Sequence, residues 1–175
     1  MPAPQPNSQA IEKWLKLIRA DGVGPTIFIR LLNAYHDIDT ILGCSARGLQ
    51  QVKGIGAAGA EKIARSLNNY DPLPELETAA KQGVWLVHYQ DERYPAPLRQ
   101  LYSPPPVLYV RGTLSKQDNL AVAIVGSRQC TIYGTEQASR FAYGLAAASI
   151  TVVSGLARGI ELPHTAAHSM QAEGR

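Results

Sequence analysis

Two short turns rich in serine, glycine and arginine are the residues of this chain best suited to bind an anion. One turn follows the apolar run AVAIV, and the other follows the apolar run TVV. Ligands of open α/β sheets bind beyond the carboxyl ends of the strands, where backbone amides and helix N-termini supply positive potential. A serine hydroxyl and a guanidinium beside such amides suit a phosphate oxygen. We therefore predict an anion-binding rim made of Gly126, Ser127, Arg128, Ser154, Gly155, Arg158 and Gly159.

The two arginines of this rim have a second interpretation, in which they only pair with nearby carboxylates. Neither turn forms a GxGxxG fingerprint or a phosphate loop ending in GKS or GKT, so the turns do not favour a dinucleotide coenzyme. They also lack a nucleophile with a matching base and acid, and we predict no catalytic residue and no cofactor. Tyr133 follows the first turn, where it could stack on a nucleic-acid base or pack into a core.

A second candidate site comes from a duplication near the N-terminus. Gly22-Val23-Gly24 is followed 32 residues later by Gly54-Ile55-Gly56, and each tripeptide lies between two helical patterns. This arrangement is typical of a helix-hairpin-helix motif, in which glycines permit the turn and expose amides that suit phosphate oxygens. Arg30 is the only cation near the first hairpin, which also carries Asp21. The secondary candidates for contact with a DNA backbone are Gly22, Gly24, Lys53, Gly54, Gly56 and Lys62.

Metal binding is not predicted. His164 and His168 have the i, i+4 spacing of a metalloprotease helix, but the residues between them are TAA and lack the required glutamate. Cys44 and Cys130 lie in separate segments without CxxC spacing, which argues against a disulfide framework or a structural zinc site.

The composition fits a globular protein outside the membrane. The 175 residues are 45% hydrophobic and 18% charged, and the net charge of +3 is spread along the chain. No basic stretch leads into an apolar run at the N-terminus, and no window approaches 18 uninterrupted apolar residues. We expect a cytoplasmic protein that makes no membrane contact.

The elements that position these residues follow from local patterns. Helical periodicity begins at Ile11. A short helix over 73–82 and strands over 84–89 and 107–110 are predicted in a proline-rich stretch, where Tyr102 and Tyr109 should hold the extended prolines 104–106 against a neighbouring surface. From 120 onward, strand, helix and strand follow one another, which predicts a βαβ unit at the start of a doubly wound parallel sheet.

The run AVAIVGSR…YG…SGLARGI…TAAH, preceded by YPAPLRQLYSPPPVLYVRG and by the helix-hairpin-helix pattern, resembles the DNA-processing protein family DprA/Smf. The resemblance extends from about residue 11 to residue 175, with four motifs in the family's order. It implies a protein without catalytic activity that binds and protects single-stranded DNA and helps load the recombinase RecA during natural transformation. It also implies a homodimer, with Arg128 as the main DNA contact, Gly126 and Ser127 shaping the turn, and the second turn forming the adjacent wall.

With this resemblance, the fold class becomes α/β, with a helix-hairpin-helix (SAM-like) helical module followed by the start of an extended Rossmann-like parallel sheet. Residues 1–10 are a disordered leader and residues 11–70 form the helical module. Residues 71–117 form a structured proline-rich connector that belongs to the Rossmann-like domain, and residues 118–175 form its first, incomplete βαβ unit.

Two departures from the family pattern affect these expectations. The family usually reads SGxARGID, whereas ELPH stands here where a single aspartate is expected, so Glu161 could take that role or the role could be lost. Family members also continue with further strands. We therefore expect that this chain is a fragment, and that its βαβ part is poorly stable or depends on a partner.

Two alternative functions remain open on sequence grounds. A nucleotide-processing enzyme similar to Rossmann-type phosphoribohydrolases would need an acidic loop resembling PGGxGTxxE, and none occurs in these residues. The N-terminal duplication could instead serve only as a protein-interaction module.

Overall fold

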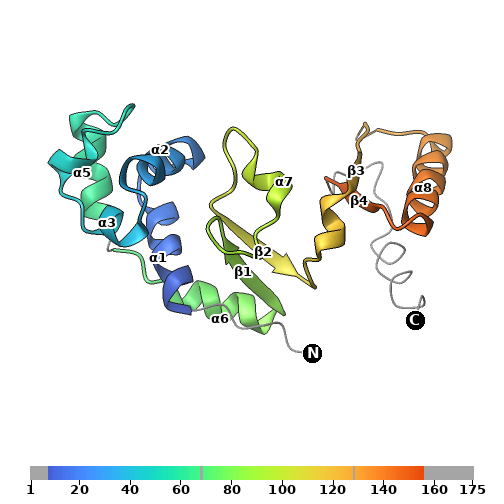
Figure 1. Cartoon of the computed structure of the whole chain (residues 1–175), viewed down its shortest axis with the longest axis horizontal. Helices are drawn as coiled ribbons and strands as arrows, with labels where there is room; N and C mark the ends of the chain where they lie inside the picture. Colours follow the sequence, from blue (N-terminus) through green and yellow to red (C-terminus); the bar gives the residue numbers. More distant parts are fainter. Residues whose placement is uncertain (1–7, 68, 128, 156–175) are drawn as a thin grey trace. The chain divides into compact units, whose positions relative to one another are not determined.

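The computed structural model describes residues 8–67, 69–127 and 129–155, and the chain divides into two compact units, 1–114 and 115–175. Figure 1 labels the elements of both units. The first unit contains α1 (Ser8–Arg19), α2 (Pro25–Tyr35), α3 (Ile38–Leu42), α4 (Ala46–Leu49), α5 (Ala57–Ser66), α6 (Leu73–Lys81), β1 (Val84–His88), α7 (Ala96–Arg99) and β2 (Val107–Arg111). The second contains a 3-10 turn, η1 (Lys116–Asn119), then β3 (Ala121–Ile124), α8 (Ile132–Ala147) and β4 (Thr151–Ser154).

The core of the first unit is built around α1, which begins at Ser8 rather than at the predicted Ile11. Its apolar residues recur at helical spacing, and Ile11, Trp14 and Leu15 are almost completely buried. The Trp14 ring packs 5.2 Å from Phe28 of α2 and stacks 4.7 Å from His88 of β1. One aromatic side chain therefore joins the first helix, the second helix and the first strand.

The two glycine tripeptides form hairpins with almost the same backbone geometry. Gly22 and Gly54 have φ values of 89° and 92°, a region that L side chains rarely adopt. In each hairpin, the residue between the glycines is buried and donates its amide to a carbonyl three residues earlier, at 3.1 Å for Val23 and 3.0 Å for Ile55. Gly24 and Gly56 then cap α2 and α5 in extended conformations. The sequence duplication is therefore a structural repeat.

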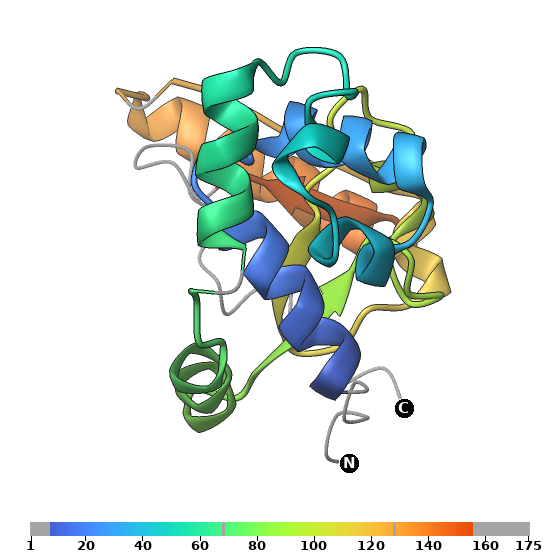
Figure 2. The ribbon, with the colours of Figure 1, turned by 90° about the vertical axis from the view of Figure 1, so that its left-hand side faces the viewer.

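The proline-rich stretch is held by a different tyrosine from those predicted. β1 and β2 pair antiparallel, with Leu86 opposite Tyr109, and α6 precedes β1 and lies beside it (Figures 1 and 2). Tyr94 is buried and donates its hydroxyl to the Pro105 carbonyl at 2.8 Å. Tyr102 is 89% exposed, so it does not hold the prolines, and the Tyr109 hydroxyl bonds elsewhere. Tyr94 was missed because sequence proximity favoured the tyrosines nearest the prolines.

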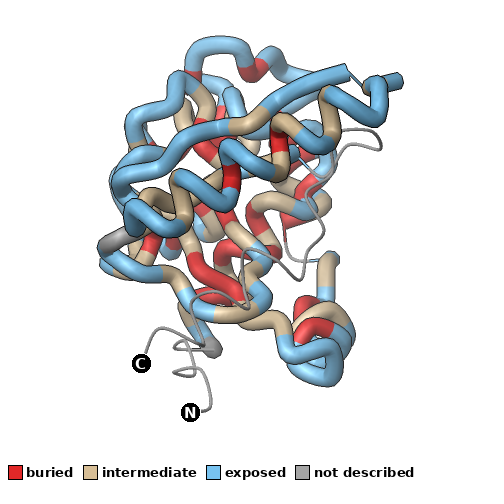
Figure 3. Tube along the Cα trace, turned by 90° about the vertical axis from the view of Figure 1, so that its right-hand side faces the viewer, coloured by how far each residue is buried: buried red, intermediate tan, exposed pale blue. Residues whose placement is uncertain are grey.

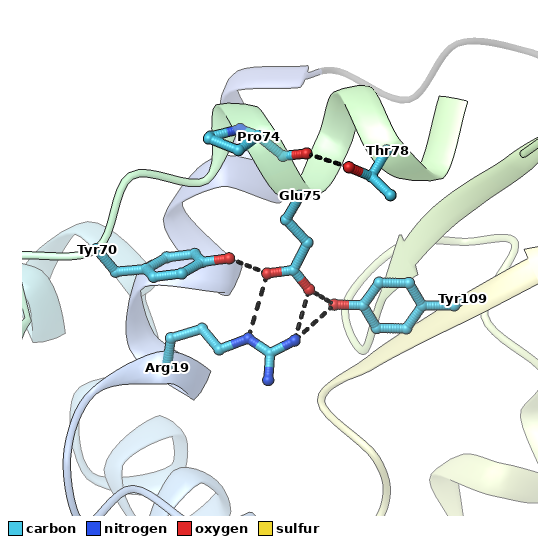
Figure 4. A network of polar contacts seen from close by, with 6 residues as sticks. All are labelled: Arg19, Tyr70, Pro74, Glu75, Thr78 and Tyr109. Atoms are coloured by element: carbon cyan, nitrogen blue, oxygen red, sulfur yellow. Dashed lines mark hydrogen bonds and ion pairs between the residues drawn. The ribbon is translucent and has the colours of Figure 1, made fainter. Parts of the chain in front are cut away.

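The Glu75 carboxylate of α6 joins three segments that are distant in sequence (Figure 4). The Arg19 guanidinium of α1 donates to both carboxylate oxygens, at 3.2 and 2.5 Å. The hydroxyls of Tyr70 and Tyr109 each donate to one of those oxygens. Burial alone would raise the pKa of Glu75, but the hydrogen bonds from Arg19, Tyr109 and Tyr70 outweigh it and lower that pKa to about 2.

The second unit is a minimal βαβ unit. β3 and β4 are parallel, with Ala121 opposite Thr151, and α8 connects them in the chain. Thr151 donates its hydroxyl to Asp118 of η1 at 2.9 Å, which anchors the start of β4. Among the described residues of this unit only Ala138 and Ala142 are buried, and the tube in Figure 3 is accordingly pale blue or tan over most of its length. Large apolar side chains, such as Phe141 at 68% exposure, face solvent.

None of the helices in the part of the chain that the structure describes has the length and apolarity needed to cross a membrane.

Replacing Glu75 should destabilise the first unit. We expect Glu75→Gln to cost about 1–3 kcal/mol of unfolding free energy at neutral pH, because Arg19 loses its charged partner. The Glu75 pKa is lower in the folded chain than its ordinary value of 4.5, so its contribution is complete above pH 4.5 and is lost as the pH falls toward about 2. Thermal unfolding measured from pH 7 to pH 2 should show that the difference in unfolding free energy between the unmodified chain and Glu75→Gln disappears over this pH range.

The matched control for this prediction is Glu77→Gln on the same helix. Within the described residues, Glu77 pairs with exposed Lys81 at 3.8 Å, an i, i+4 contact that contributes at most about 0.5 kcal/mol. Equal losses of stability in the two variants would contradict a special role for Glu75.

Candidate nucleic-acid interface

The parallel register brings the two serine-glycine turns to one edge of the second unit's sheet. Ile124, the last residue of β3, lies opposite Ser154, the last residue of β4. Gly126 and Ser127 follow the first strand after Val125, and Gly155 directly follows the second. The backbone amides and serine hydroxyls of both turns therefore lie at the carboxyl ends of the strands, the edge where ligands of such sheets bind.

The three remaining members of the predicted rim, Arg128, Arg158 and Gly159, lie outside the described residues, as do His164, His168 and Glu161. Their roles stay predictions.

The described part of the rim is open. Gly126, Ser127 and Gly155 are exposed, and a Cβ added at Gly155 would meet nothing within 4 Å. The Ser127 Oγ accepts the Gln129 amide at 3.1 Å, which shapes the turn and leaves the hydroxyl proton free to be donated. A ligand oxygen could thus approach both the backbone and this hydroxyl.

The helix α8 begins beside this rim with a side-chain cap. Thr131 precedes the helix in an extended conformation, and its Oγ1 accepts the Gly134 amide at 3.1 Å. A Cβ at Gly134 would lie 3.4 Å from that oxygen, so the small residue fits the cap closely. The cap therefore fixes where the helix starts relative to the Gly126-Ser127 turn.

Tyr133 projects from the first turn of α8 and is 70% exposed, which contradicts the core-packing alternative in this unit as described. Arg140, seven residues later on the same helix, is also exposed. Residues at i and i+7 share one helix face, so a cation follows the aromatic ring along that face. Sequence motifs did not single out Arg140, although its spacing from Tyr133 was available as a signal.

The secondary candidates all lie in the first unit, around the two hairpins. Added Cβ atoms at Gly24 and Gly56 would meet nothing within 4 Å, so the backbone at both positions is accessible. Lys62 lies 3.9 Å from the Asp21 carboxylate of the first hairpin. Arg30 of α2, which follows the first hairpin in the chain, donates to the Lys53 carbonyl of the second hairpin at 3.0 Å. The sequence did not predict this bond, because it joins residues 23 positions apart and depends on how α2 packs against the second hairpin.

Metal ligands do not gather in the described residues: no group of three or more histidine, cysteine or acidic side chains could hold an ion there. Cys44 and Cys130 are both free thiols.

Comparisons with known proteins agree with this architecture. The chain combines a helix-hairpin-helix tandem with a Rossmann-like parallel unit, and a model of the SAM-like helix-hairpin-helix tandem matches residues 15–69. The model described as DNA recombination-mediator protein A matches residues 85–174. The chain therefore belongs to this family, which includes the DprA and Smf proteins.

Individual relatives support the same assignment. Protein Smf of Synechocystis is 32% identical over 152 residues, covering 85% of this chain and 38% of that protein. The DNA processing protein DprA of Bacillus subtilis is 32% identical over 109 residues, covering 61% of this chain and 36% of its own length. The X-ray structure of DprA from Streptococcus pneumoniae has a TM-score of 0.64 at 23% identity, covering 97% of this chain and 55% of that one. The chain thus spans less than two fifths of the length of the Synechocystis and Bacillus subtilis relatives.

Removing the Thr131 cap should loosen the helix beside the rim. We expect Thr131→Ala to lower the opening free energy of α8 by about 1 kcal/mol, because the Gly134 amide loses its acceptor. Thr131→Ser keeps the acceptor oxygen and should behave like the unmodified chain. Amide hydrogen exchange over residues 132–147 measures the change, and unaltered exchange in Thr131→Ala would show that the cap does not hold this helix.

Proposed function

We propose that this protein binds single-stranded DNA, without catalysing a reaction on it, at the rim formed by the two strand-end turns. In this role it protects incoming DNA in the cytoplasm and assists loading of RecA during natural transformation. The observation that carries the proposal is the parallel register of β3 and β4, which puts two serine-glycine turns at one sheet edge in a member of a DNA recombination-mediator family. The names of the DprA relatives, which describe DNA processing, support the same role.

Each rim residue has a physical role in this proposal. Arg128 and Arg158 supply guanidinium groups that can bind phosphate oxygens in a bidentate manner. Gly126, Gly155 and Gly159 let the DNA backbone approach the protein main chain, because they carry no side chain. Ser127 and Ser154 donate hydroxyl protons.

Tyr133 would supply the stacking platform. Binding of single-stranded nucleic acid without sequence preference usually combines a cationic surface with exposed aromatic rings, since every base has a π-face. Its 70% exposure leaves the ring available. Arg140 on the same helix face would add a phosphate contact.

Dimerisation belongs to the same proposal. α8 and the sheet expose large apolar side chains, such as Phe141 at 68% and Val153 at 51% exposure, and exposed apolar side chains can form part of a protein–protein interface. We assign no particular partner surface to them.

The arginines should account for much of the affinity. We expect the double variant Arg128→Ala, Arg158→Ala to bind a fluorescein-labelled oligothymidine more weakly than the unmodified chain does. The slope of log Kobs against log salt should also fall by about 0.7 for each lost phosphate contact. Fluorescence anisotropy over a salt series measures both quantities. Lys116→Ala is the control, because Lys116 is an exposed cation of η1 before the opposite end of β3. Unchanged affinity in the double variant would exclude the rim.

The Tyr133 ring should contribute by stacking rather than by its hydroxyl. We expect Tyr133→Ala to weaken oligothymidine binding by about 1–3 kcal/mol and Tyr133→Phe to bind like the unmodified chain. Unlike the arginine variants, neither change should alter the salt dependence, because no charge is removed. Equal weakening by the alanine and phenylalanine variants would contradict stacking.

A further inference from the structure

His88, the last residue of β1, places a titratable ring in the contact between the strands and the helices of the first unit. Its imidazole stacks on Trp14 of α1, with the ring centres 4.7 Å apart and the planes 9° from parallel. Trp14 is 1% exposed and also packs against Phe28 of α2. A change in the charge of the imidazole therefore acts directly on the side chain that joins α1, α2 and β1.

The surroundings of one ring nitrogen determine which protonation state fits. The Nδ1 atom of His88 is buried and has no hydrogen-bond partner in the part of the chain that the structure describes. A neutral imidazole can leave one nitrogen unprotonated, whereas both nitrogens of an imidazolium are donors. An added proton would thus place a charged N–H group where it meets no acceptor, which is costly. The neutral ring is the form that this site accommodates.

The charged groups around His88 do not compensate for an added proton. Burial lowers the pKa of His88 below its ordinary value of 6.5, and Asp91 opposes this shift while Arg93 assists it. Asp91 and Arg93 pair with each other at 2.6 Å, so their effects on the ring partly cancel. Among the other elements packed against β1, α1 contacts the ring through Trp14, and β2 places buried Val107 opposite His88. Charged side chains of α1 and α6 have partners elsewhere: Lys13 pairs with Asp39, Arg19 with Glu75 and Lys81 with Glu77.

We propose that His88 makes the contact between the helices and the β1–β2 pair sensitive to pH. The neutral ring covers the Trp14 indole, and a proton added at Nδ1 is accommodated only when the ring leaves the indole, so that the end of β1 separates from α1. The end of β2 moves with it, because Val107 pairs with His88 and the Tyr89 amide donates to the Pro106 carbonyl at 2.9 Å. This proposal is independent of nucleic-acid binding and involves none of the rim residues.

The pH range in which this contact opens differs from the range in which Glu75 titrates. The pKa of His88 is lower in the folded chain than its ordinary value, so the contribution of the neutral ring is complete above pH 6.5 and is lost as the pH falls below that value. The contribution of Glu75 is lost only below pH 4.5. Measurements that stop at about pH 5 therefore report on His88 without Glu75.

The test follows the fluorescence of Trp14 in the full chain. The sequence has two tryptophans, and Trp85→Phe removes the other one, so this parent chain reports on Trp14 alone. Urea unfolding and the emission maximum are measured from about pH 8 to about pH 5 for the parent and for three variants of it. His88→Phe keeps an aromatic ring but cannot take a proton, and His88→Gln removes both the ring and its titration. His36→Asn is the matched control, because His36 is an exposed histidine of the same unit and asparagine tolerates its positive φ.

We expect the unfolding equilibrium constant of the parent, relative to that of His88→Phe, to rise by up to about tenfold for each pH unit below 6.5, because the open form binds a proton that the closed form does not. Over the same range the Trp14 emission of the parent should shift to longer wavelength, since the indole meets water. His36→Asn should show the same rise and the same shift. His88→Phe and His88→Gln should show neither, and His88→Gln should be less stable than the parent at pH 8.

Three results would overturn the proposal. The first is the same pH dependence in the parent and in His88→Phe, and the second is loss of that dependence in His36→Asn. The third is quenching of Trp14 emission on acidification without a shift in wavelength, which would mean that the imidazolium stays on the indole face, to which cations are attracted. If His88→Phe does not fold, the comparison of the parent with His88→Gln and the emission of the parent itself decide the question in the same way.

Discussion

The burial of Trp14 is the contact on which the first unit depends. This ring lies on α1, is 1% exposed, packs against Phe28 and stacks on His88 with an angle of 9° between the planes. Leu86 of β1 and Val107 of β2 belong to the same buried cluster as the apolar residues of the helices, so the strand pair shares the core that this ring helps to fill. The stack also favours a neutral imidazole: burial lowers the pKa of His88, opposed by the nearby Asp91 carboxylate and assisted by Arg93. The Arg19–Glu75 contact also restricts how α6 is oriented against α1, because a bidentate pair forms in few relative orientations.

The second unit has no comparable anchor in its described residues. Two alanines are its only buried side chains there, and alanine burial removes little apolar surface from water. Its order depends instead on backbone pairing between β3 and β4 and on local caps such as Thr131. This contrast bears on the proposed function. Under that proposal, a rim on a sheet with few buried side chains can adjust to a flexible single strand, whereas buried Val23 and Ile55 hold the hairpins in the core of the first unit.

Local patterns predicted most elements because their causes are local. The apolar runs at 121–124 and 151–154 and the paired glycine tripeptides each determine their own backbone, and the structure has them at those places. Contacts between distant segments were wrong or missed: Tyr94 holds the prolines in place of Tyr102 and Tyr109, and the bond from Arg30 to the second hairpin was not predicted. Neither contact has a sequence signal, because it depends on how α2 and the β-pair pack. For the rim, the parallel register follows from the pattern, while Arg128 and Arg158 lie outside the described residues.

The hairpins separate what a backbone repeat determines from what it does not. Both halves repeat the positive φ of Gly22 and Gly54 and the buried residue after each glycine, because these features serve the packing of paired helices. Packing places no demand on the residue that precedes the glycine, because its side chain is exposed in both hairpins. That position is therefore free to carry Asp21 in one half and Lys53 in the other. Two halves with the same backbone can thus differ in surface charge without any change in their buried residues.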